Sequence, residues 1–241
     1  MLSAETLFAT LDATWPAAQS WRDGPWRHRD GAGGGQRVSA TTLEGDASEQ
    51  ALDRLLATAP PRLFMIRTGT AESRLDAWLA DRGYDVKDPC IGWACRIDPE
   101  TPPPPPMTGF AIWPPLSIMA DLWAEGGIDA ARLAVMERAQ GPKTGILGRI
   151  DDRAAGVAFV AMRGDVAMLH ALEVTVDQRR KGAARQIMAH AANWAAGQGA
   201  RCLCLVTTGD NAPSNALYAS LGMERVAQYH YRVGMPLGRT T

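Results

Sequence analysis

One junction in the last third of the chain has the residue types needed to hold a phosphate-bearing cofactor. Arg179, Arg180 and Lys181 bring positive charge to the position directly before Gly182. Apolar residues recur at helical spacing after this glycine, which predicts a helix starting there. A helix N-terminus leaves backbone N–H groups unpaired, and a glycine allows a ligand to approach the backbone closely. We therefore expect a cofactor held at this point through its pyrophosphate.

A second pattern follows the expected helix. Residues 201–207 are an apolar segment typical of a strand, and the chain continues as Asn211-Ala-Pro-Ser-Asn-Ala-Leu-Tyr218. This segment ends in Leu221-Gly222-Met223. Asn211 can cap a helix, and the tyrosine lies on a helical stripe, so a strand followed by a helix is expected here.

Together the two patterns resemble the GNAT superfamily of acyl-CoA-dependent N-acetyltransferases over roughly residues 108–234. The first motif of that family, [Gln/Arg]-x-x-Gly-x-[Gly/Ala], is matched by Arg179-x-x-Gly182-x-Ala184. The second, Asn-x-x-Ala-x-x-x-Tyr-x-x-x-Gly-Phe, is matched with Ser214 and Met223 as departures. The resemblance implies acetyl-CoA as co-substrate and direct attack of a primary amine on the thioester.

The resemblance also implies which residues hold the cofactor and which do the chemistry. The cofactor residues would be Val174, Thr175, Val176, Arg179, Arg180, Lys181, Gly182, Ala183, Ala184 and Asn211. Tyr218 matches the general acid that protonates the leaving thiolate, and its ordinary pKa of about 10 keeps it protonated at neutral pH. Among the residues themselves, the base stays open between His170, Glu173 and a water chain. Glu173 is expected on the opposite strand face from His170, because strand side chains alternate.

The fold that must position these residues is α/β (α+β), a central mixed, mostly antiparallel sheet flanked by helices. The expected elements of the second half are helices at 116–125 and 129–139, a hairpin of 143–150 with 154–163, and a central strand at 166–176. The run Thr101-Pro-Pro-Pro-Pro-Pro106 favours an extended spacer. It divides an accessory part, 1–100, from a linker, 101–107, and a catalytic domain, 108–241.

The first half is expected to be a smaller α/β domain. Helices are predicted at 5–20, 47–57 and 71–82, with strands at 62–67, 84–88 and 91–97. Gly31–Gly35 is interpreted as a hairpin turn between strands at 26–29 and 36–42. The segment ending in Gly83-Tyr84 echoes the one ending in Gly222-Met223, with Leu79 opposite Tyr218. This resembles tandem GNAT proteins in which one half has lost its cofactor site.

Charge and cysteine content bear on which partners and cofactors the protein is expected to have. The net charge of −1 gives no global field for nucleic acid or an anionic membrane. We expect a cytoplasmic protein without a signal peptide, and no metal site, since the four cysteines lack metal-ligand spacing. The expected partner is an acceptor amine, either a small molecule or a protein N-terminus or lysine, and a homodimer is left open. Alternatives are a non-catalytic acyl-CoA sensor or scaffold, another acyl donor, or an oxygen acceptor.

Overall fold

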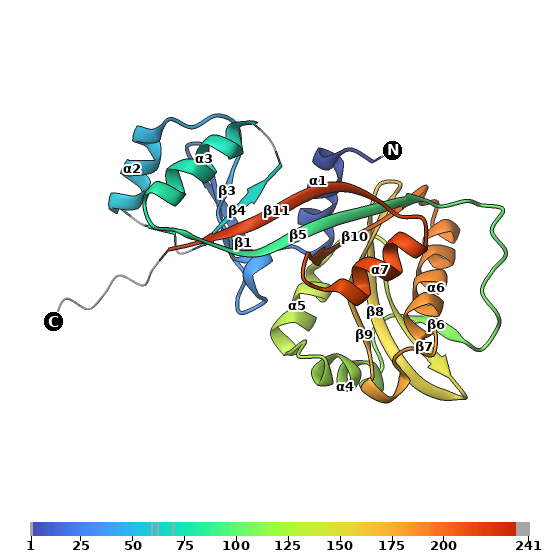
Figure 1. Cartoon of the computed structure of the whole chain (residues 1–241). Coiled ribbons are helices and arrows are strands. Elements are labelled where there is room, and N and C mark those ends of the chain that lie inside the picture. The colour runs from blue at the N-terminus through green and yellow to red at the C-terminus, as the bar shows by residue number, and fades with distance from the viewer. Residues whose placement is uncertain (1, 59, 62, 69, 235–241) are drawn as a thin grey trace.

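One eight-stranded sheet runs through the computed structural model, which describes residues 2–58, 60–61, 63–68 and 70–234 (Figure 1). Its strand order is β4-β11-β5-β10-β9-β8-β7-β6. The strands are β4 Leu63–Arg67, β5 Asp85–Arg96, β6 Gly109–Ile112, β7 Lys143–Ile150, β8 Arg153–Arg163, β9 Val166–Val174, β10 Cys202–Thr208 and β11 Glu224–Val233. Neighbours are antiparallel except β9 and β10, which are parallel. The predicted mixed, mostly antiparallel sheet is therefore confirmed.

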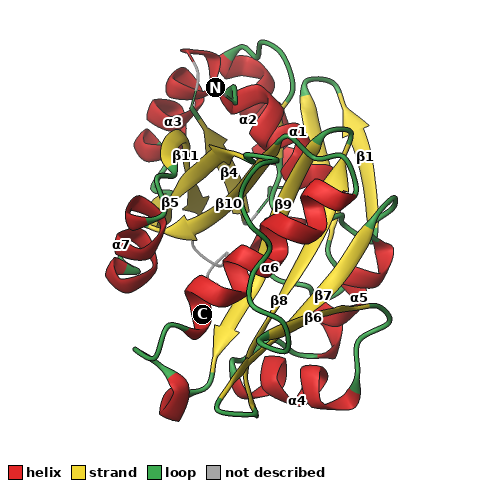
Figure 2. Ribbon diagram, turned by 90° about the vertical axis from the view of Figure 1, so that its right-hand side faces the viewer, coloured by secondary structure: helices red, strands yellow, loops and turns green. Residues whose placement is uncertain are grey.

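Helices cover both faces of this sheet (Figure 2). On one face, α6 (Ala183–Gly197) and α7 (Ala212–Ser220) enclose a core that includes Ile187 and Tyr218. On the other face, α4 (Ser117–Glu125) and α5 (Ala130–Arg138) pack with Trp15, Trp123 and Phe159. The helix α1 (Ala4–Thr14), which leads into Trp15, lies against β8, β9 and β11. The strands and helices predicted for the second half all form, with ends shifted by one or two residues.

The N-terminal part adds a small antiparallel sheet of β1 (Gln19–Asp23), β2 (Trp26–Asp30) and β3 (Thr42–Leu43). The hairpin turn predicted at Gly31–Gly35 is wrong: of the strand expected at 36–42 only Thr42 belongs to β3, and residues 31–41 form a longer connection between the antiparallel β2 and β3. Gln36–Val38 forms a 3-10 helix instead. The tight turn of this sheet joins β1 to β2, where Gly24 adopts a φ of +57°.

Two other boundaries differ from the sequence prediction. The first helix ends at Thr14, because residues 19–23 pair with β2 as a strand. The two short strands expected at 84–88 and 91–97 are one strand, β5, in which Asp88 has a φ of +46° and the register against β11 shifts. Helices α2 (Glu49–Thr58) and α3 (Thr70–Asp81) agree with prediction, as does β4, although position 62 lies outside the described residues.

The echo between the two halves is present in the backbone. Gly83 follows α3 with a φ of +77°, and Gly222 follows α7 with a φ of +73°. In both places the next N–H closes the helix end, since Tyr84 donates to Leu79 O at 3.0 Å and Met223 donates to Tyr218 O at 3.1 Å. Such left-handed glycine caps terminate helices and redirect the chain. Each cap leads into a long strand, and the two strands, β5 and β11, pair with each other.

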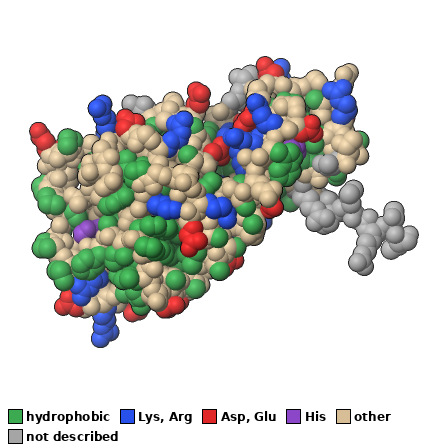
Figure 3. All heavy atoms as spheres, turned by 180° about the vertical axis from the view of Figure 1, so that it is seen from behind, with side chains coloured by type: hydrophobic (Ala, Val, Ile, Leu, Met, Phe, Trp, Pro, Cys, Tyr) green, Lys and Arg blue, Asp and Glu red, His purple; other side chains and the backbone are tan. Residues whose placement is uncertain are grey.

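The proline-rich segment connects β5, in the middle of the sheet, to β6 at its edge. The proposed division of the chain at 101–107 stays a prediction, and the two parts that it separates share the eight-stranded sheet. Within the described residues, no helix is both long enough and apolar enough to cross a bilayer. Acidic and basic side chains are interspersed on the face seen in Figure 3, in keeping with the net charge of −1.

Candidate active site

The parallel strands β9 and β10 separate halfway along their length. They pair from Val166 and Cys202 as far as Leu169 and Leu205. Beyond that point β10 continues along β5, where Thr208 lies opposite Cys90, whereas β9 continues along β8. The edges of β9 and β10 that face each other beyond Leu169 therefore have no partner strand, and a ligand can enter between them.

A groove of about 680 Å³ lies at this separation. Its lining includes seven of the ten predicted cofactor residues: Val174, Arg179, Arg180, Gly182, Ala183, Ala184 and Asn211. Two of the others, Thr175 and Val176, line a small cavity of about 50 Å³ beside it. The strand ends at Val174, so Val176 lies in a 3-10 helix (Val176–Gln178) rather than in the predicted strand, and it is 77% exposed.

The turn between β9 and α6 has the geometry of an anion-binding loop. Arg180 has a φ of +62°, and Gly182 has a φ of +88° as the N-cap residue of α6. The first helical hydrogen bond runs from Gln186 N to Gly182 O, so the N–H groups of residues 183–185 have no partner within the helix. Nothing lies within 4 Å of where a Cβ at Gly182 would be. This helix end can accept a diphosphate in the way the sequence predicted.

A β-bulge in β9 changes the direction of the side chains that precede the groove. Phe159 of β8 lies opposite His170, but Val157, two residues earlier on β8, lies opposite Glu173, three residues later on β9. The extra residue is accommodated at Ala171, which has a φ of +52°. The indole Nε1 of Trp123 donates to Ala171 O at 2.9 Å and is fully buried, so α4 fixes the bulge from the side.

The bulge overturns the expectation that Glu173 and His170 point to opposite faces. His170 packs on the α4 side of the sheet, stacked on Trp15 with ring centroids 5.0 Å apart. Glu173 lies against Gly126 at the end of α4, where an added Cβ would come within 2.5 Å of Glu173 Cγ. Both side chains are therefore on the α4 face. The alternation rule fails here because one residue is inserted between them.

His170 is enclosed and neutral. It is 4% exposed, and burial, together with the charge of Arg37, holds its pKa well below the usual 6.5. Thr14 Oγ1 donates to Thr10 O at 2.7 Å, so its oxygen is left to accept from His170 Nε2 at 2.8 Å. Nδ1 is then the unprotonated nitrogen, and it is buried with no hydrogen-bond partner among the described residues.

Glu173 has a different environment, half-buried at the edge of the groove. It lines both the large groove and the small cavity, which it shares with Glu125. Burial raises the pKa of its carboxyl above the usual value, while Arg179 and Arg132 lower it. A carboxylate with a raised pKa is a better proton acceptor at neutral pH than an ordinary one. Of the two candidate side chains, Glu173 is the one in contact with open space.

Tyr218 approaches the sheet from the opposite face. It is 4% exposed in the core under α7, and burial raises its pKa, so the hydroxyl keeps its proton at neutral pH. Asn211 accepts from Ser214 N at 3.2 Å and so caps α7 as well as lining the groove. The neighbouring Asn215, which the sequence motifs do not single out, has a structural role. It donates to Thr208 O and Gly209 O and accepts from Trp93 Nε1 at 3.0 Å, which ties the end of β10 to β5 and α7.

No group of three or more His, Cys, Asp or Glu side chains suited to a metal ion occurs in the described part of the chain. Of the predicted catalytic side chains, Glu173 lines the groove, whereas Tyr218 is buried and does not line it, although Ser214 and Leu217 of the same helix do.

Comparison with known proteins gives a match over the same region. Residues 113–223 match the family model described as the acetyltransferase (GNAT) family. No curated protein matches the chain. A GCN5-related N-acetyltransferase from Kribbella flavida is similar in structure, with a TM-score of 0.67, 17% identity and coverage of 99% of this chain and 97% of its own.

Two further solved structures are similar in fold. A conserved protein of unknown function from Staphylococcus epidermidis has a TM-score of 0.63 at 7% identity, covering 92% of this chain and 95% of its own. A tandem GNAT protein from the clavulanic acid biosynthesis pathway has a TM-score of 0.56 at 17% identity, covering 79% and 69%. At these identities the likeness concerns the fold.

Proposed function

Since residues 113–223 match the acetyltransferase (GNAT) family, we propose that this protein transfers an acetyl group from acetyl-CoA to a primary amine. Family and fold support an acyltransferase. The finer proposal rests on one observation: Glu173 borders both the cofactor groove and the small cavity on the α4 side. A carboxylate in that position can accept a proton from an amine that enters from the α4 face while the thioester lies in the groove.

In the proposed reaction the protein binds the cofactor, accepts a proton from the amine and donates a proton to the thiolate. The backbone of β9 beyond Leu169 would pair with the pantetheine arm, and the N–H groups at Gly182–Ala184 would hold the diphosphate with Arg179 and Arg180. Glu173 would take the proton of the acceptor ammonium, directly or through one water. The amine nitrogen then attacks the thioester carbon, the carbon–sulfur bond breaks, and Tyr218 would donate its proton to the thiolate. The nitrogen still carries one proton more than an amide keeps, and this proton would pass to the Tyr218 phenolate, which restores the phenol.

His170 is not favoured as the base in this proposal. Its Nε2 is held by Thr14, and its Nδ1 is buried away from the groove. Its depressed pKa makes it a weak proton acceptor. The acceptor class is inferred from the charges: Glu125, Glu173 and Arg179 line the small cavity, and their net formal charge of −1 favours a cationic amine over a neutral hydroxyl compound. A small amine and a protein N-terminus or lysine both fit this chemistry.

Cofactor binding is tested by calorimetric titration of acetyl-CoA and CoA into Gly182→Asp. The added carboxylate faces the diphosphate at close range, so we expect binding to weaken on the order of 10²-fold. Gly199→Asp is the matched control, because Gly199 also has a positive φ, +90°, and open space at its Cβ, but lies beyond the other end of α6. Equal affinity in wild type and Gly182→Asp would contradict the proposed clamp.

Turnover is tested by thiol release against a panel of amines. We expect Tyr218→Phe to lower kcat about 10²-fold or more with little change in acetyl-CoA binding. Tyr84→Phe, which removes a hydroxyl bonded to Pro61 O in the N-terminal part, is the control. Saturable binding without turnover of any amine would favour the non-catalytic sensor, and full activity of Tyr218→Phe would exclude it as the acid.

A further inference from the structure

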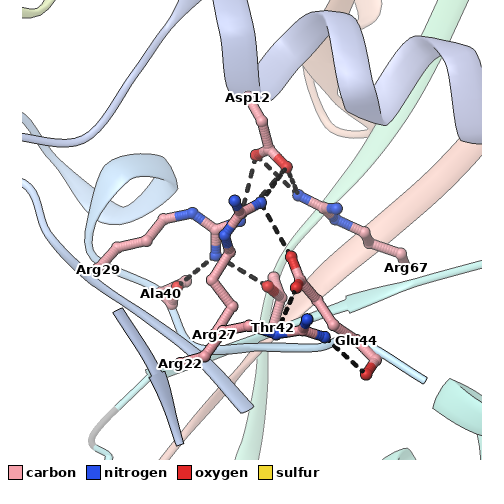
Figure 4. Close-up of polar contacts among 8 residues, drawn as sticks. All are labelled: Asp12, Arg22, Arg27, Arg29, Ala40, Thr42, Glu44 and Arg67. Carbon is pink, nitrogen blue, oxygen red and sulfur yellow. Dashed lines mark hydrogen bonds and ion pairs between the residues drawn. The ribbon is translucent and has the colours of Figure 1, made fainter. Parts of the chain in front are cut away.

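The carboxylate of Glu173 makes no hydrogen bond or ion pair with another residue in the part of the chain that the structure describes. Asp12 of α1 shows the contrasting case. It accepts from Arg67 Nη2 at 2.9 Å and from Arg29 Nη2 at 3.3 Å, so two arginines fix its position (Figure 4). The place of the Glu173 carboxylate, between the groove and the small cavity, therefore depends on the packing around its side chain.

Gly126, the residue that ends α4, leaves the space that the Glu173 side chain occupies. A Cβ added at Gly126 would lie 2.5 Å from Glu173 Cγ, 2.6 Å from its Cδ and 2.8 Å from its Oε2. Carbon atoms that are not bonded to each other pack at about 3.5–4.0 Å. Any side chain at position 126 would therefore displace the Glu173 side chain.

The backbone at Gly126 does not itself require a glycine. Its φ of −79° and ψ of 3° are open to other residues. The next residue, Gly127, makes the left-handed turn that leaves α4, with a φ of +79° and nothing within 4 Å of an added Cβ. The two glycines thus have different roles, because Gly127 turns the chain and Gly126 leaves room for Glu173.

Gly156 of β8 makes a similarly close contact with the main chain of Glu173. It pairs with Val174 of β9, and a Cβ added to it would overlap Glu173 O and lie 3.1 Å from Ile187 Cδ1 of α6. The close approach of β8 and α6 therefore fixes the main chain at Glu173, and the close approach of α4 confines its side chain.

Ionisable groups from four parts of the fold lie around the Glu173 carboxyl. Glu125 of α4 and Arg179 of the cofactor loop line the small cavity with it. Burial raises the pKa of Glu173, and the charges of Arg179 and of Arg132 on α5 oppose this effect. Burial also raises the pKa of Tyr218 on α7, and the charge of Glu173 adds to it. A Glu173 carboxyl moved into solvent would therefore have a lower pKa, closer to the ordinary value.

We propose that Gly126 is a positioning residue, which by its lack of a side chain lets Glu173 hold its carboxylate between the groove and the small cavity. The inference rests on the proposed function, in which Glu173 is the base. With alanine at position 126, the methyl group would take the place of Glu173 Cγ and Cδ, and the carboxylate would turn toward solvent. It would then lie beyond hydrogen-bond reach of the amine, and proton transfer would slow.

The test follows the side-chain carboxyl carbon of Glu173 by carbon-13 NMR during a pH titration of the full-length protein without cofactor. Glu173→Gln assigns the signal. In Gly126→Ala we expect a lower pKa of Glu173, a kcat about tenfold or more below wild type, and an acidic limb of kcat/KM at lower pH. The Kd of acetyl-CoA should stay within about twofold. Gly197→Ala is the matched control, because Gly197 ends α6 and an added Cβ there meets nothing within 4 Å.

The NMR titration and the kinetics separate this proposal from the proposed function. An unchanged pKa of Glu173 in Gly126→Ala would overturn the positioning role, whatever happens to kcat. A lowered pKa with an unchanged kcat would support the positioning role and overturn Glu173 as the base. In the Glu173→Gln background, Gly126→Ala should cost no further activity, and a further tenfold loss would overturn an effect through Glu173.

A second variant covers the case in which Gly126→Ala does not fold. The double variant Gly126→Ala/Glu173→Ala removes the side chain that the new methyl group would meet. We expect it to fold like wild type, as measured by circular dichroism and urea denaturation. An unfolded double variant would overturn the proposal, because contact with Glu173 would then not be the reason for a glycine at position 126.

Discussion

Two ionisable side chains on the same face of β9 have different capacities to accept a proton. Glu173 borders the groove with a raised pKa, whereas His170 is buried with a depressed one. Burial disfavours the charged form of both groups, and this raises the pKa of a carboxyl but lowers that of an imidazole. The carboxylate is thereby improved as a base and the imidazole is weakened.

At this scale we expect Glu173→Gln to lower kcat by about 10²- to 10⁴-fold, because it removes the proposed base. In wild type, kcat/KM should fall as pH decreases through the raised pKa of Glu173, since the protonated carboxyl cannot accept a proton. The variant should lack this acidic limb. Glu125→Gln, in the same small cavity, should keep the limb and change mainly KM for the amine. An unchanged pH profile in Glu173→Gln would assign the base elsewhere.

His170 makes a separate prediction about stability. Its folded pKa lies well below the unfolded value of about 6.5, so the unfolded chain binds more protons as pH falls. The stability that the neutral imidazole contributes is present above pH 6.5 and is lost below it. Between pH 7 and 5.5, wild type should lose about 1 kcal/mol more unfolding free energy than His170→Asn. Urea denaturation measures this, and parallel losses in the two proteins would contradict it.

At the scale of elements, the bulge in β9 depends on α4. Trp123→Phe would remove the donor to Ala171 O and leave a buried carbonyl without its partner, costing about 1–3 kcal/mol of stability. If the bulge relaxes, Glu173 turns from the groove, so we also expect kcat to fall. Trp113→Phe is the control, since Trp113 contacts Phe159 and Lys143 through its ring. A stability loss with normal kinetics would show that the bulge persists without the indole.

The sequence predicted the helices and strands far better than it predicted the bulge in β9. Periodicity and glycine caps located α6, α7 and the strands around them, because those signals are local. Nothing local marks Ala171 as left-handed, since alanine has no preference for positive φ, and the indole that donates to its carbonyl lies 48 residues away in the sequence. The groove could be predicted because its motif specifies a loop and a helix end. The relation between Glu173 and His170 could not, because it depends on the bulge.

For the whole molecule, the position of β5 determines how the N-terminal part is joined to the rest of the chain. It pairs with β10 on one side and β11 on the other, although it precedes the proline-rich segment. Pairing between distant strands leaves no periodic signal, so the sequence suggested two consecutive units and could not show a shared sheet. The N-terminal part contributes strands to the sheet that positions the cofactor groove.

We therefore expect residues 108–234 alone not to fold cooperatively, because β10 and β11 would lose their partner and the Trp93–Asn215 hydrogen bond would be absent. Urea denaturation followed by circular dichroism measures this. Co-expression with residues 2–100 should restore a stable complex, and Gly-Ser insertion within 101–106 should be tolerated. A cooperative transition in the fragment alone would show that β5 is dispensable.

The order of the strands also determines how long β5 remains unpaired during synthesis. About a hundred residues separate the end of β5 from the start of β10, its first neighbour in the sheet. At the ribosome's 5–20 residues per second, β5 waits roughly 5–20 s before its partners emerge. During that interval the nascent chain exposes an unpaired strand that carries Trp93. Exposed strands of this kind bind chaperones and promote aggregation. The yield of folded protein should therefore depend on the rate of translation, and not only on the free energy of unfolding of the native state.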